Sequence, residues 1–288
     1  MSATAFWLNN QGMKIMSDTF DINMARTVHL KWELDLEAMV AGRIEPTTLE
    51  SHENCHLGRW LHFVGVKKYQ DIEAIHQLID VHRNFHKVAD KIVFDLKHSK
   101  WGSVEKNLKQ VQSISMDIIF MLTVIEFSSL EKQRGFHSLP NPIRKLMRQL
   151  FEKENVSKQN GHQVLEVSHA RLTHVRWSRD LLEAFRNRGR DVQLSPAETC
   201  PLGVWIRTVG LHKFGELPPM QKLDEAHKSF HLKADQSLNA LKRKNDRQAD
   251  QAYEAMLRYS QEVIYLLTMI EYRLQNNDAI APPVSISG

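Results

Sequence analysis

Hydrophobic residues recur every three or four positions in four segments of the first half of the chain, 22–39, 55–64, 72–96 and 104–125. This spacing gathers apolar side chains on one face of a helix, and the alternation typical of strands is nearly absent. The short second segment is expected to end at Gly65. An antiparallel four-helix bundle buries three long stripes and one short one, so the pattern predicts an all-α fold of this kind.

The second half of the chain repeats the first without a gap. Cys55 and Cys200 are the only cysteines, and both stand in the setting Cys-x-Leu-Gly-x-Trp, 145 positions apart (200 − 55 = 145). The same offset aligns further pairs, which are His29 and His174, Trp32 and Trp177, His82 and His227, His86 and His231, Arg26 and Arg171, and Glu126 and Glu271. Such self-similarity indicates two tandem bundles, which we expect at 17–133 and 160–278.

The segments outside the two bundles have simpler interpretations. Residues 1–16 and 279–288 are expected to be tails, the second of them disordered. In the linker 134–159, Asn141-Pro142 is typical of a helix start and precedes an apolar stripe with basic neighbours. This pattern predicts a short connecting helix packed on a bundle; a basic amphipathic helix that binds a membrane surface or a partner is the alternative.

Composition limits the classes of function. A content of 42% hydrophobic and 25% charged residues is that of a soluble globular protein. The formal charge is only +4, with acidic residues mixed among the basic ones, which disfavours nucleic-acid binding. No run of about eighteen apolar residues indicates a transmembrane segment, and the N-terminus lacks the pattern of a secretory signal. We therefore expect a cytoplasmic protein whose cysteines are reduced thiols or metal ligands rather than a disulfide.

Four residues of each unit have the types and positions of metal ligands. His82 and His86 are four apart on one helix, so both imidazoles leave the same face. His29 lies on the inner face of the first helix, and Cys55 begins the second, where the positive end of the helix dipole favours a thiolate. Alone, a His-x-x-x-His pair or a buried cysteine more often belongs to a core. The second unit retains the spacings of 26, 27 and 4 residues (55 − 29, 82 − 55, 86 − 82), and this recurrence favours metal binding.

One sulfur and three imidazole nitrogens form a tetrahedral set that suits Zn²⁺, so the sequence predicts two zinc ions per chain. The predicted ligands are His29, Cys55, His82 and His86 in the first site and His174, Cys200, His227 and His231 in the second. Gly58 is expected to permit close approach of the second helix to its neighbour.

These motifs resemble the chemoreceptor zinc-binding (CZB) domain of bacteria. Its pattern is a histidine on the first helix, Cys-x-Leu-Gly-x-Trp, and His-x-x-x-His on the third helix, and the resemblance extends over both units. It implies the same eight ligands, and a zinc-dependent regulator attached to a chemoreceptor or a diguanylate cyclase whose cysteine–zinc pair can act as an oxidant switch. The chain departs from that pattern because it has two such units and no recognisable output domain.

Further residues are candidates for supporting the sites. Trp32 and Trp60, with Trp177 and Trp205, are expected to exclude water from the metal. Asp90, Asp235, Glu126 and Glu271 could accept a hydrogen bond from an imidazole, or could equally form ordinary salt bridges or solvated faces. The nine remaining histidines, among them His52, His56, His62, His169 and His212, are not matched by histidine in the other unit and are interpreted as surface residues.

The sequence favours a sensory or regulatory module that responds to zinc or to oxidation of its cysteines and acts on a protein signalling partner. The two units could pair as an internal pseudo-dimer, or the chain could form a homodimer. Two other classes stay open. One is a structural zinc adaptor, and the other is a non-haem metal enzyme, which a closed four-ligand site disfavours because it leaves no position for substrate.

Overall fold

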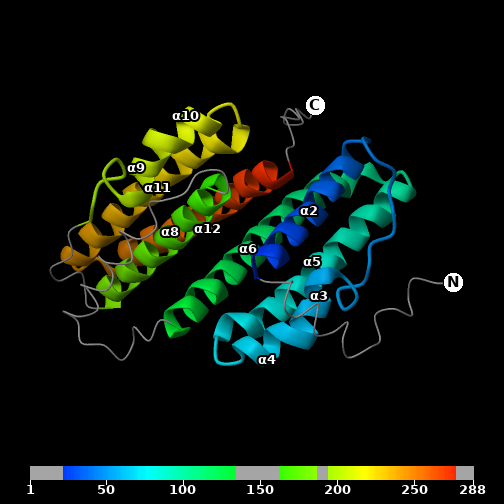
Figure 1. Ribbon diagram of the computed structural model, residues 1–288, viewed down its shortest axis with the longest axis horizontal. Coiled ribbons are helices and arrows are strands. Elements are labelled where there is room, and N and C mark those ends of the chain that lie inside the picture. The colour runs from blue at the N-terminus through cyan, green and yellow to red at the C-terminus, as the bar shows by residue number, and fades with distance from the viewer. Residues whose placement is uncertain (1–21, 134–161, 187–193, 277–288) are drawn as a thin grey trace. The chain divides into compact units, whose positions relative to one another are not determined.

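The computed structural model describes residues 22–133, 162–186 and 194–276, and this part of the chain is helical, with no strand. The chain divides into two compact units, residues 1–126 and 127–288, and each is described by itself. The predicted all-α fold is confirmed (Figure 1). The tails and the linker helix predicted around Asn141 lie outside the described residues.

The helices of the first unit come from the four predicted segments. They are α2 (Ile22–Val40), α3 (His56–Trp60), a π-helical turn (Leu61–Gly65), α4 (Val66–Tyr69), α5 (Glu73–Lys97), a 3₁₀ turn (Trp101–Ser103) and α6 (Val104–Gln133), whose last residues belong to the second unit. One cluster of buried apolar side chains draws on all of these elements except the 3₁₀ turn and includes Leu36, Leu57, Ile75 and Ile118. The periodic stripes therefore meet in a common core, as expected for a bundle.

The segment after the first cysteine is longer than predicted. Gly65 does not end the helix: its φ of −57° and ψ of −53° are helical, and the chain continues through α4. A π-helical turn joins α3 to α4, and a Cβ on Gly65 would meet the Trp60 ring at 3.0 Å. The glycine is therefore required for packing against the indole rather than for helix termination.

A tight turn joins α5 to α6. Ser99 has a φ of 54°, in the left-handed region, and its N–H donates to Leu96 while that of Lys100 donates to Asp95. These two bonds form a Schellman motif at the end of α5, which satisfies carbonyls that the helix leaves without partners. The short connection makes the two helices antiparallel neighbours.

The elements α3 to α6 recur 145 positions later, except that the residues equivalent to the 3₁₀ turn are the first residues of α12. The helices of the second unit are α8 (His162–Arg186), α9 (Pro201–Trp205), a π-helical turn (Ile206–Gly210), α10 (Leu211–Phe214), α11 (Pro218–Lys242) and α12 (Asp246–Asn276). Lys244, the counterpart of Ser99, also has a left-handed φ, of 57°. Helix α12 packs on α11 and on α8 around buried residues such as Met220 and Leu267. The repeat in the sequence is thus a repeat of helices and turns.

One helix in the described part of the chain, Trp101–Lys132, is long and apolar enough to cross a membrane by length and composition. We expected no such segment from the sequence. Its residues Val111, Ile118, Leu122 and Ile125 are buried in the core of the first unit. A helix at the centre of a bundle passes the same test, because it too is apolar over much of its length.

Candidate metal centres

Cys55 caps the N-terminus of α3. Its backbone is extended (φ −65°, ψ 163°), and its Sγ accepts a hydrogen bond of 3.3 Å from the N–H of Gly58. A Cβ on Gly58 would lie 1.8 Å from the carbonyl oxygen of His52, so only glycine fits at this position. The closest contact at Gly58 is therefore with the turn immediately before the cysteine, rather than with the neighbouring helix as predicted. That turn fixes the direction of the thiol.

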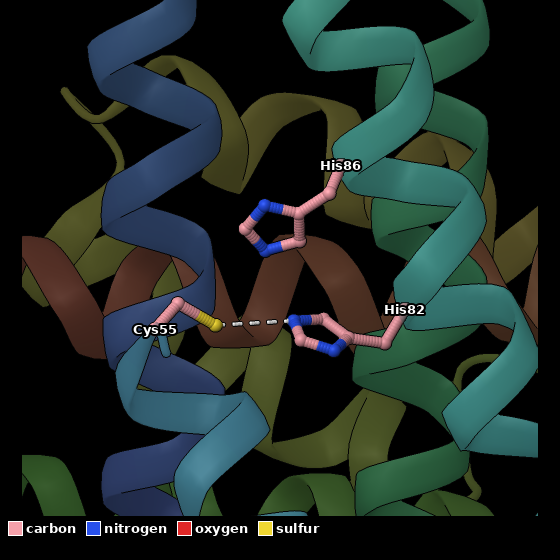
Figure 2. A group of neighbouring side chains, drawn as sticks. All are labelled: Cys55, His82 and His86. Carbon is pink, nitrogen blue, oxygen red and sulfur yellow. Dashed lines mark hydrogen bonds between the residues drawn. The ribbon is translucent and has the colours of Figure 1, made fainter. Parts of the chain in front are cut away.

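Two histidines of α5 face this thiol. Figure 2 shows the Cys55 Sγ directed at Nε2 of His82, 3.4 Å away, with His86 one helical turn further along. The rings of His82 and His86 are 4.8 Å apart, and both side chains are buried. One ligand atom from each of the three residues lies within 4.8 Å of the others, close enough to hold one metal ion.

The fourth predicted ligand lies beside this group rather than in it. His29 of α2 is buried, and its ring is 6.3 Å from that of His82. Its Nε2 is 3.1 Å from Oγ of Ser115 on α6, within hydrogen-bonding distance. The structure therefore brings together three of the four predicted ligands, and a role for His29 in metal binding stays a prediction.

The buried imidazoles are held in the neutral form, the form that binds metals. Burial lowers the pKa of His82 from 6.5 to about 2, helped by His29, His86 and His52. Burial, with a smaller effect from His86, lowers the pKa of His29 to about 3. The pKa of His86 falls to about 4 through burial and His52, while the Glu50 backbone acts in the opposite direction. Because these pKa values lie far below 7, a lone pair is available at neutral pH.

The pKa of the Cys55 thiol is higher than its place at a helix start would predict. The N–H groups of Gly58 and Leu57 favour a thiolate, as expected at a helix start, but burial outweighs them and raises the pKa of Cys55 above its usual value. The helix terminus alone therefore does not ionise this cysteine. A bound cation would supply the missing stabilisation and displace the proton, which makes metal affinity dependent on pH.

The second unit reproduces the arrangement. Ligand atoms of Cys200, His227 and His231 also lie within 4.8 Å of one another, and Sγ of Cys200 is 3.2 Å from Nε2 of His227. His174 is again outside the group, with Nε2 3.0 Å from Oγ of Ser260. The pKa of His227 is lowered to about 4 and those of His174 and His231 are lowered, chiefly by burial. Burial raises the pKa of Cys200.

The four tryptophans occupy different places. Trp177 contacts His231, with ring centroids 4.7 Å apart, and its exclusion of water from a metal stays a prediction. Trp60 is buried against Tyr69 and the π-helical turn, and Trp205 is half-buried near Phe214. Trp32 packs on the core of the first unit. Among the four, only Trp177 has a ring contact with a candidate ligand in the described structure.

The predicted carboxylates also separate into two groups. Glu126 binds Arg26 at 2.8 Å, and the fully buried Glu271 binds Arg171 at 2.5 Å, so both belong to salt bridges between the first and last helices of a unit. Asp90 and Asp235 are exposed. Asp235 nevertheless opposes the burial that lowers the pKa of His231, which places its charge close to that ring.

Two features near the centres were missed from the sequence. Ser115 and Ser260, which lie within hydrogen-bonding distance of the first-helix histidines, were not identified from the sequence, although serine at two equivalent positions was a usable signal. His52 was assigned to the surface, but it is half-buried and its ring is 6.4 Å from that of His86. No repeat could reveal it, because Ala197 stands at the corresponding position. The predicted exposure of His56, His62, His169 and His212 is confirmed.

Comparison with known families supports the geometry. Residues 29–93 match the sequence profile of the chemoreceptor zinc-binding domain. Searches among curated proteins and among solved structures give no match. The matched segment contains His29, Cys55, His82 and His86. This part of the chain is therefore similar to a zinc-binding domain of the chemoreceptor type, and it carries the cysteine and both α5 histidines of the first candidate centre.

Proposed function

We propose that the chain is a zinc-binding regulatory protein with two centres, each built from three histidines and one cysteine. The observation that supports this most strongly is the convergence of a buried cysteine and two buried histidines in both units. Burying several titratable polar groups side by side is costly unless a ligand engages them. We further propose that the second unit is another chemoreceptor zinc-binding domain, since its elements and candidate ligands recur at the same offset.

The donor set fits zinc. Thiolate sulfur and imidazole nitrogen are the ligands of structural zinc sites, which are tetrahedral and closed. In Figure 2, Nε2 of His86 is the ring nitrogen directed toward the cysteine. The other ring nitrogen, Nδ1, is buried without a hydrogen bond of normal geometry, and the Glu50 backbone acts to raise the pKa of this ring. His29 completes the proposed set if its ring turns from Ser115 toward His82.

The cysteines make the proposed centres sensitive to oxidants. In the simplest reaction, the Cys55 thiolate attacks hydrogen peroxide; an S–O bond forms, the O–O bond breaks, and hydroxide leaves. Sulfur gives up two electrons to become sulfenic acid, which is a poor zinc ligand. Loss of the thiolate would loosen α3 from α5, and we propose that the change passes to α6 because His29, once released from the metal, returns to its hydrogen bond with Ser115.

Native mass spectrometry of the full chain, purified without chelator, tests this proposal. We expect two zinc ions per chain, and the loss of at least one after treatment with a mild oxidant such as hydrogen peroxide or hypochlorous acid. Reduction with dithiothreitol and added zinc should restore the original mass. A chain without zinc, or with iron in its place, would contradict the proposal. Two ions that resist both oxidant and chelator would instead favour the structural adaptor.

A metal enzyme is the less favoured class, because four protein ligands leave no open position for a substrate. It would be supported by a coloured, iron-containing protein as purified.

The proposed output is a protein signalling partner, such as a chemoreceptor or a diguanylate cyclase, reached from α6 and α12. Pairing of the units within one chain, or of two chains as a homodimer, belongs to the same proposal. Small-angle scattering with mass determination in solution would separate a paired monomer, a homodimer and two separated lobes.

A further inference from the structure

We propose that His52 is a reserve ligand of the first centre, which takes the place of Cys55 when its thiolate is lost, and that the second centre has no such ligand. This inference rests on the proposed zinc binding. It predicts that the two centres respond differently to the same oxidant.

The position of His52 supports this role. It lies in the turn that carries the cysteine, and its own carbonyl oxygen is 3.9 Å from Sγ of Cys55. Its ring is 6.4 Å from that of His86, and the side chain is 34% exposed, so it stands at the mouth of the centre. No histidine other than His29, His52, His82 and His86 has a ring contact within this centre in the described structure.

The distance is close to what coordination needs. With zinc–nitrogen bonds of about 2.0–2.1 Å, the centroids of two imidazoles on one tetrahedral ion are roughly 5 Å apart. The His52 ring therefore needs to approach His86 by about 1 Å, well within the range of a side-chain rotation. His29, which the family pattern assigns as a ligand, is at nearly the same distance from its own neighbour, since its ring is 6.3 Å from that of His82.

His52 is close enough to both α5 histidines to affect their ionisation. After burial, the nearby His52 contributes to the lowered pKa values of both His82 and His86, and it opposes the burial that raises the pKa of Asp90. Its Nε2 is 3.9 Å from a carboxylate oxygen of Glu53, which is largely exposed. This contact is too long for a hydrogen bond, so moving the ring toward the centre breaks no strong interaction.

The second unit offers a natural comparison. Ala197 occupies the position of His52, and its carbonyl oxygen likewise lies 3.6 Å from Sγ of Cys200. The turn thus brings the equivalent backbone carbonyl to the thiol, but position 197 has no imidazole. Loss of the thiolate at Cys200 leaves at most three ligands, whereas the first centre can return to four. We expect the second centre to release zinc first, which would make the chain a graded sensor.

The test replaces oxidation by permanent removal of the thiol, in full-length chains with one centre silenced. In a His227→Ala/His231→Ala background, Cys55→Ala is compared with Cys55→Ala/His52→Ala. In a His82→Ala/His86→Ala background, Cys200→Ala is compared with Cys200→Ala/Ala197→His. Zinc affinity is measured by competition with a chromophoric chelator, and cobalt substitution reports the geometry and whether a thiolate is bound. Circular dichroism checks that each chain is folded.

We expect His52→Ala to lower zinc affinity by a further factor of about 10 or more in the Cys55→Ala chain, the size typical of losing a supporting group. Ala197→His should raise affinity by a similar factor in the Cys200→Ala chain. Cobalt-loaded Cys55→Ala should keep tetrahedral d–d bands but lose the thiolate charge-transfer band. Equal affinity with and without His52 would overturn the inference while leaving zinc binding intact. Parent backgrounds that bind no zinc would overturn the proposed function itself.

Discussion

The replacement Gly58→Ala tests how the fold holds the first thiol. A Cβ at this position would lie 1.8 Å from the His52 carbonyl oxygen, whereas real Cβ contacts are essentially never shorter than 3.0 Å. The carbonyl must therefore retreat by about 1.2 Å (3.0 − 1.8). It belongs to backbone, which has no flexible end to yield, so the turn that carries Cys55 must move as a whole.

Displacing the turn that carries Cys55 should weaken zinc binding at the first centre, because metal–ligand distances tolerate little change. Metal–ligand distances in working sites stay within about 0.2 Å of their ideal values, so a shift of this size removes the sulfur from its position. We expect zinc affinity at the first centre to fall by a factor of at least about 100, the upper range for disturbing groups that orient a ligand. Forcing the extra methyl group into the packed turn should also cost about 1–3 kcal/mol of unfolding free energy.

Gly102→Ala is the matched control. It adds the same methyl group in the same unit, but nothing lies within 4 Å of its Cβ. Chelator competition should give unchanged affinity for this variant, and urea denaturation in chelator should show a change within about 0.5 kcal/mol. Native mass spectrometry should find one zinc ion in Gly58→Ala and two in the control. If Gly58→Ala keeps both ions and matches the control in urea, the argument from backbone contact is refuted.

Three further predictions follow from burial and backbone geometry. In zinc-free protein, His82 keeps a pKa of about 2 while the unfolded chain titrates at 6.5, so stability falls as pH drops below 6.5. The loss is about 2 kcal/mol per such histidine at pH 5, and a constant urea midpoint would contradict it. Glu271→Gln leaves the buried Arg171 charge without its anion, so it should lower the unfolding free energy measured in urea by about 3 kcal/mol. Glu126→Gln should lower it by less, because the Glu126 carboxylate is 22% exposed, and equal losses would contradict this. Lys244→Gly should raise unfolding free energy by about 1 kcal/mol, because glycine adopts the observed φ of 57° without strain, and a decrease would contradict the left-handed cap.

The helices could be predicted because each carries its own evidence. Three stripes of 18 or more residues fix the period at 3.6, and the repeat supplies a second, independent reading of every element. The π-helical turn after Trp60 could not be predicted in this way. One extra residue in a single turn leaves the apolar pattern unchanged, and Gly65 is as typical of a helix end as of close packing on an indole.

The candidate sites could be predicted in composition more fully than in geometry. Cys55, His82 and His86 meet as expected because a helix face and a helix start fix their directions. The bond between His29 and Ser115 depends on which polar residue α6 presents opposite α2, and no local pattern encodes that choice. The raised pKa of the metal-free thiol could not be predicted for a related reason: the helix-start effect is local and visible in the sequence, whereas burial, which outweighs it, is a property of the assembled unit.

The salt bridges between the first and last helices of each unit determine how metal binding would move those helices. Arg26 lies one turn before His29 on α2, and both reach α6, at Glu126 and at Ser115 respectively. Arg171 and His174 make the equivalent contacts with α12. If the histidine turns to join a metal, its bond to the serine breaks while the buried ion pair, with its larger cost of disruption, stays in place. The first and last helices of a unit would then remain fixed at the ion pair and separate at the histidine, so binding at the centre would become a change in the angle between them.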